Sequence, residues 1–194
     1  MTITADSRRT DREEFAAPID IEIETNGHIA YASEFILAGR EVRPKVTYFF
    51  GSEKILSISS RPFENEEDQH KALMEMFHML SSLKAHTSFI MMHNNVTLAN
   101  GQIMPAIICV TLTPHGALPE AYPYTIVDGE LDFLQVYDLD DDQGLFSKII
   151  QHMLPVFSTS GRFPFYPTEV LQWLAAIGHD INFFGKYNPS NLDV

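Results

Sequence analysis

The sequence predicts one α+β domain, in which an antiparallel sheet meander is covered by one long helix at about residues 66–84. Three observations support this fold class: an amphipathic pattern fills that range, strand-like stretches with short connections follow it, and alternating stretches separated by turn residues precede it. The length of 194 residues suits one domain. We expect residues 1–14 to be a disordered polar tail and residues 15–194 to form the domain.

The first organised segment is predicted to be a β-hairpin. Ile19, Ile21 and Ile23 alternate with acidic residues, and a second alternating stretch covers residues 29–35. Asn26-Gly27 lies between these stretches, and this dipeptide favours a tight hairpin turn because both turn positions need positive φ. We therefore expect N-terminal hairpins, of which this is the first.

The long helix is the next predicted element. Asn65 is a suitable N-cap, and the acidic residues that follow it suit the positive end of the helix dipole. Apolar residues recur at helical spacing and predict a buried stripe of Leu73, Met76, Phe77, Leu80 and Leu83.

Strands are predicted on both sides of this helix, and a helical C-terminus follows them. A second hairpin is expected from Val46–Phe50 and Ile55–Ser59. The meander comprises Ser88–Leu98, Gln102–Thr113 and Tyr122–Tyr137, the last broken at Asp128-Gly129. A short helix is expected at Leu145–Leu154, and Pro167 opens a last helix that Gly178 closes.

The charge balance limits the partners. The formal net charge is −13, and no lysine or arginine occurs between Lys84 and Lys148, where 63 residues include eight acids. Such a surface repels phosphates and anionic lipid, so we expect no direct nucleic-acid partner and no membrane partner. The chain has no apolar run of about 18 residues and no apolar leader core at its N-terminus, so we expect a cytoplasmic (intracellular) protein.

The sequence predicts no cofactor and no metal. Cys109 is the only cysteine, and its apolar neighbours predict a buried structural thiol. His70 and His78 are eight residues apart and lie out of line on a helix, which makes them a poor ligand pair. The acidic stretch from Asp138 has Gln143 and Ile149 where a calcium loop needs its glycine and its glutamate, and it is interpreted as a helix-capping turn. Phosphate-cradling glycine motifs are absent.

Two groups of residues are candidates for a site. His93, Asn94 and Asn95 interrupt an apolar stretch, and His115 lies at a strand end. The first three are either a polar site at a strand bend or, as we favour, a bulge or turn with solvated amides. The second group comprises aromatic residues near the C-terminus, which are candidates for a protein interface: Phe163, Phe165, Tyr166, Phe183, Phe184 and Tyr187. The alternative is that these aromatics pack the last helix onto the sheet.

From these observations we favour a non-catalytic acidic protein that acts through protein–protein binding, including self-association as a homodimer. One alternative is a small hydrolase whose histidines and acids converge only in three dimensions. A further alternative is an acidic decoy or inhibitor of a basic, nucleic-acid-binding partner. No catalytic residue can be assigned from the sequence.

Overall fold

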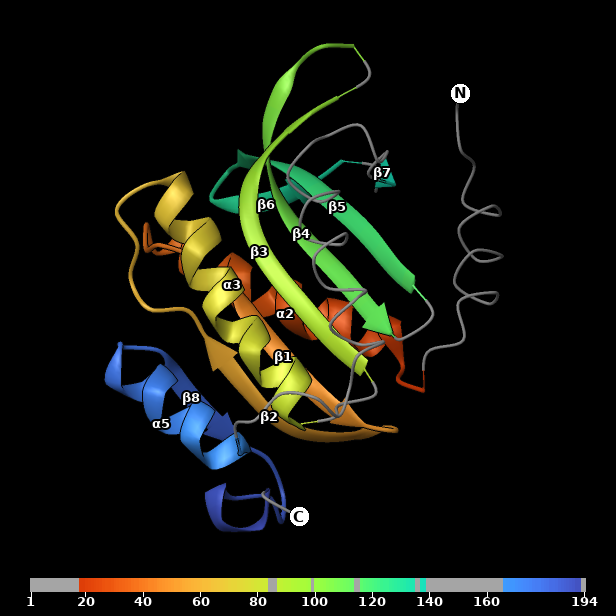
Figure 1. The fold of residues 1–194 in the computed structure, drawn as a ribbon. Coiled ribbons are helices and arrows are strands. Elements are labelled where there is room, and N and C mark those ends of the chain that lie inside the picture. The colour runs from red at the N-terminus through yellow and green to blue at the C-terminus, as the bar shows by residue number, and fades with distance from the viewer. Residues whose placement is uncertain are drawn as a thin grey trace.

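A computed structural model describes residues 18–83, 87–98, 100–113, 116–134, 137–138 and 166–192, which form an antiparallel sheet between layers of helices (Figure 1). The helices are α2 (Ile21–Leu37), α3 (Glu66–Leu83), α5 (Pro167–Ala176) and the short 3-10 helix η2 (Pro189–Asn191). The strands are β1 (Lys45–Phe50), β2 (Glu53–Ser59), β3 (Thr87–Thr97), β4 (Ile103–Thr113), β5 (Gly116–Val127), β6 (Glu130–Phe133), β7 (Tyr137–Asp138) and β8 (Asp180–Phe183).

The eight strands form one antiparallel sheet in the order β6-β5-β4-β3-β1-β2-β8, with β7 paired to β5 beside this path. The meander from β3 to β6 and the β1–β2 hairpin are both confirmed. The break at Asp128-Gly129 is confirmed too, because both residues have positive φ, at 52° and 83°. The sheet continues beyond the meander, since β1 pairs with β3 and β8 returns from the C-terminus to pair with β2.

Each face of the sheet carries its own core. Ile90 and Met92 of β3 pack in the cluster that contains the α3 stripe, whereas Phe89 and Met91 pack in the cluster that contains Ala32 of α2. This alternation follows from the two-residue period of a strand. Figure 1 shows α3 in front of the sheet and α2 behind it. The expectation of one long covering helix is therefore corrected: α3 has 18 residues, and α2, with 17, covers the opposite face.

The predicted N-terminal hairpin is wrong, because that segment is α2. Asp20 caps the helix by accepting a hydrogen bond from the Ile23 amide at 3.1 Å. Gly27 lies inside the helix without positive φ, and Ile23 is 66% exposed although strand alternation would bury it with Ile21. The buried positions of α2 are Ile21, Thr25, His28 and Ala32, a helical spacing.

The C-terminal prediction is confirmed in part. Pro167 is the first residue of α5, and Gly178 follows the helix with φ of 99°, but β8 then adds a strand. Cys109 is buried in β4, as predicted. The polar tail 1–14 and the helix expected at 145–154 lie outside the described residues. Among the helices that are described, none is long and apolar enough to cross a membrane.

Candidate functional site

The described part of the chain contains a pocket of about 480 Å³ where the end of α2, the start of α3 and the middle of β3 meet. This volume lies within the roughly 300–1,000 Å³ that small-ligand sites occupy. The pocket is lined by Ile36, Arg40, Glu41, Val42, Phe63, Glu64, Asn65, Glu66, Gln69, His93, Asn94, Asn95 and Tyr124. It therefore contains three of the four polar residues that the sequence marks as candidates. The fourth, His115, lies outside the described residues.

The sheet wall of the pocket pairs a histidine with a tyrosine. His93 Nε2 lies 2.9 Å from the Tyr124 hydroxyl, which comes from β5, 31 residues later in the chain. Burial lowers the pKa of His93 and raises the pKa of Tyr124. His93 is therefore a neutral imidazole at neutral pH, and Tyr124 keeps its proton. This pair offers hydrogen-bonding groups without charge.

Two amide side chains satisfy backbone groups beside His93. β1 ends its pairing with β3 at Met91, so the backbone of β3 beyond this point lies at an open edge on that side of the described sheet. The Gln69 side chain donates to the His93 carbonyl at 3.4 Å, and the Asn94 side chain accepts from the Asn95 amide at 2.8 Å. β3 pairs with β4 through this stretch without a shift in register, so the favoured bulge or turn is wrong.

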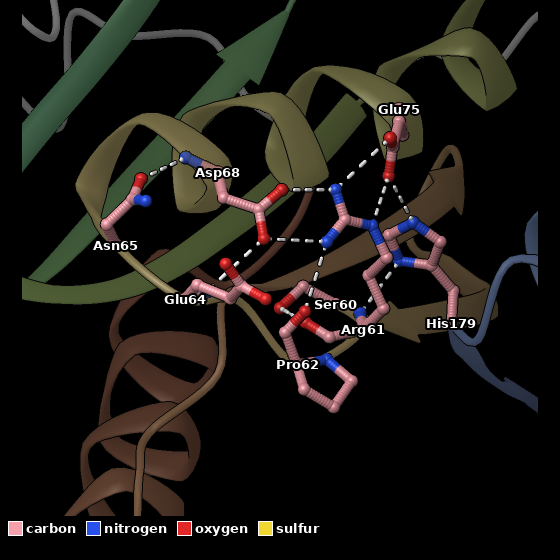
Figure 2. Close-up of polar contacts among 8 residues, drawn as sticks. All are labelled: Ser60, Arg61, Pro62, Glu64, Asn65, Asp68, Glu75 and His179. Carbon is pink, nitrogen blue, oxygen red and sulfur yellow. Dashed lines mark hydrogen bonds and ion pairs between the residues drawn. The ribbon is translucent and has the colours of Figure 1, made fainter.

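A second wall includes Phe63, Glu64 and Asn65 of the segment 60–65, which Arg61 anchors to α3. Its guanidinium donates to both carboxylate oxygens of Asp68, at 2.7 and 3.0 Å, and to Glu75 Oε2 at 2.9 Å. Figure 2 shows the guanidinium between these two carboxylates. Asn65 then caps α3 by accepting from the Asp68 amide at 3.0 Å. Bidentate, charge-assisted hydrogen bonds are strong and directional, so this wall is held in place before any ligand binds.

His179, from the C-terminal part of the chain, also holds the segment 60–65 in place. The Arg61 amide donates to His179 Nδ1 at 3.1 Å, so the ring proton lies on Nε2, which donates to Glu75 Oε2 at 3.0 Å. Burial is the main cause that lowers the pKa of His179, and Glu75 partly opposes it. Burial raises the pKa of Glu75, but hydrogen bonds from Arg61 and His179 outweigh it and lower this pKa. Since the His179 side chain is 0% exposed and uses both nitrogens, this pair is structural.

The pocket lining is acidic on balance. It holds one arginine, Arg40, against three glutamates, Glu41, Glu64 and Glu66, which is a formal net charge of 1 − 3 = −2. The Arg40 guanidinium stacks over the Phe35 ring, 4.1 Å from its centroid. The described lining contains no serine, threonine or cysteine, and Tyr124 is the hydroxyl that lies against His93.

The described aromatic interface candidates lie around β8, at the β2 edge of the sheet, and at the start of α5. Phe183 and Tyr187 are half-buried against the α3-side core, and the Tyr187 hydroxyl donates to Glu53 at 2.7 Å. Phe184 is half-buried beside Lys54, and Tyr166 is 63% exposed at the start of α5. Phe163 and Phe165 lie outside the described residues. The homodimer expected from these aromatics stays a prediction, which light scattering at micromolar concentration would test.

A buried polar cluster, which no sequence pattern above predicts, lies beneath α2. His28 is buried against Phe89, with ring centroids 4.7 Å apart, and contacts Thr47 of β1. Beside it, Glu24 forms an ion pair of 2.9 Å with Lys54. The helical spacing of Thr25 and His28 with Ile21 and Ala32 was a usable signal, but the hairpin pattern concealed it. Among the described residues, no group of three or more His, Cys, Asp or Glu is placed to hold a metal ion.

The residues that complete the pocket around His93 carry no local sequence signal, because they come from α2, the loop after it, the segment 60–65, α3 and β5. A scan against protein-family models and searches of curated proteins and of solved structures find no match to this chain.

Proposed function

We propose that this chain is a non-catalytic binding protein that recognises a segment of a partner protein at the pocket between α3 and β3. The observation that carries this proposal is a pocket whose walls are already held in place. Arg61 anchors one wall through four side-chain hydrogen bonds to Asp68 and Glu75, and His93 is held against Tyr124 in the other. A preformed site binds more tightly because less ordering is required on binding.

The composition of the lining supports binding over hydrolysis. Ile36, Val42 and Phe63 supply apolar surface, and the side chains around His93 supply a few polar groups, which is the usual make-up of a recognition pocket. Hydrolases often use a serine, threonine or cysteine nucleophile or a metal-bound water. The described walls lack Ser, Thr and Cys and contain no three-residue metal cluster, which favours binding over these forms of hydrolysis.

A random peptide library displayed on phage tests the proposal when it is selected on the wild-type protein and on a blocked variant. Asn95→Trp places a large side chain on an exposed strand position of the pocket lining. Thr125→Trp is the matched control, because Thr125 is an exposed position of β5 outside the lining.

We expect peptides that bind the wild-type and Thr125→Trp proteins equally and bind Asn95→Trp at least about tenfold more weakly, a loss of about 1.4 kcal/mol. Circular dichroism confirms that both variants fold. A selection that yields only peptides indifferent to Asn95→Trp, or no peptides, overturns the proposal.

A further inference from the structure

We propose that the pocket takes an arginine side chain from a basic segment of the partner. This inference rests on the proposed binding function and names the chemistry that the pocket recognises. The occupant is a protein segment, and its arginine is matched to the pocket by charge and by shape.

The charge of the lining is the first argument. Glu41 lies 3.8 Å from Arg43, a distance at which the two groups only weakly neutralise each other. Glu64 and Glu66 are exposed, and neither forms an ion pair among the described residues. Arg40 is the one cation of the lining, and its guanidinium stacks over the Phe35 ring. Two carboxylates are therefore available to a guanidinium that enters beside α3.

The apolar part of the lining is the second argument. An arginine has a three-carbon stem that packs on apolar surface while its charged end reaches polar groups. Ile36, Val42 and Phe63 provide this surface in the same pocket as the glutamates. The aromatic rings of Phe63 and Tyr124 also suit a planar cation. A guanidinium is more weakly hydrated than an ammonium group, so arginine is favoured over lysine in such a site.

The histidine of the pocket is compatible with a cationic occupant. Burial lowers the pKa of His93, so its ring adds no positive charge at neutral pH. The net charge of −13 on the whole chain then acts in the same direction, because it attracts basic segments at long range.

The test is an NMR titration of the ¹⁵N-labelled full chain with Nα-acetyl-L-arginine methylamide. The control ligand is the corresponding citrulline derivative, which has the same shape without the charge. Glu64→Gln/Glu66→Gln removes two carboxylates from the lining. Glu22→Gln/Glu67→Gln is the matched control, because it removes two exposed carboxylates outside the lining and leaves the same net charge.

We expect amide shifts at residues 64–66 and 93–95, and binding of the citrulline derivative at least about fivefold weaker. Loss of the two lining carboxylates should weaken arginine binding about tenfold, whereas the matched control should change it less than twofold. Raising the salt concentration to about 1 M should weaken binding further. Equal binding of the two ligands, equal loss in both double variants, or shifts confined to other surfaces would overturn the inference.

The two experiments separate this inference from the proposed function. If the peptide selection gives pocket-dependent peptides without basic residues, the arginine inference is wrong and the binding function remains supported. If no selected peptide depends on the pocket, the proposed function itself is wrong.

Discussion

The stability of the fold should depend on pH through His28, and one substitution isolates this dependence. His28 Nδ1 lies 2.8 Å from the Glu24 carbonyl, which can only accept, so Nδ1 carries the proton. Nε2 lies 3.3 Å from the Thr47 hydroxyl and is the unprotonated acceptor. Burial lowers the pKa of His28 to about 4; the positive charges of Lys45 and Lys54 add to this, and the contacts with Glu24 oppose it.

The direction of the effect follows from the two pKa values. Above pH 6.5, His28 is neutral in the folded and unfolded chains, and the full stability is present. Below pH 6.5 the unfolded chain binds a proton that the folded chain does not bind, so the free energy of unfolding falls. The loss continues until the pH passes the folded pKa of about 4. With these values, lowering the pH from 7.5 to 5.5 reduces the contribution of His28 to the free energy of unfolding by about 1.3 kcal/mol.

Urea denaturation of the wild-type chain and of His28→Gln measures this contribution. The difference in unfolding free energy between the two proteins should shift by about 1.3 kcal/mol, in the direction that favours the variant, from pH 7.5 to pH 5.5. Groups common to both proteins cancel in the difference. The measurements stop at pH 5.5, above the pI of about 4.9, because protein molecules with a low net charge tend to associate with one another. A difference that does not change with pH, or a His28 ring that titrates by NMR near pH 6.5, would refute the reasoning.

Two further predictions concern backbone conformation and the anchored wall of the pocket. Gly27→Ala should stabilise the chain by about 0.5–1 kcal/mol, because Gly27 is an exposed residue inside α2 with open space around it. Gly39→Ala should destabilise the chain by about 1 kcal/mol, because Gly39 has φ of 64°. If thermal melts rank the two variants the other way, the segment around Gly27 is not helical and the predicted hairpin is favoured instead. Arg61→Ala should destabilise by about 2 kcal/mol, between the values for exposed and buried ion pairs, and Arg61→Lys should recover only part of it. A melting temperature unchanged in Arg61→Ala would show that the segment 60–65 is held by other contacts.

Sequence patterns predict the elements whose signals are local. The α3 stripe is apolar at helical spacing, and Leu73, Met76 and Phe77 are buried as it predicts. The break between β5 and β6 is recognisable because the pair Asp128-Gly129 is typical of the positive φ that both residues have there. Here the residues that decide the conformation lie within a few positions of one another.

Local patterns failed at α2 because its buried face is half polar. Thr25 and His28 occupy helical core positions, so the apolar residues that remained showed the two-residue period of a strand. The cap at Asp20 and the glycine at position 39 marked the helix, but the hydrophobic period outweighed them. Packing against the second face of the sheet favours the helix, and this packing does not show in the period of the segment itself.

The site is formed by contacts between segments that are distant in the sequence. The sequence marks His93, Asn94 and Asn95 as unusual in a strand, but it does not show that Tyr124 lies 2.9 Å from His93. The contact between Arg61 and His179 joins residues 118 positions apart and depends on β8 returning to the edge of β2. Such contacts are set by the topology of the sheet, which depends on the packing of the whole chain and leaves no period or motif in either segment.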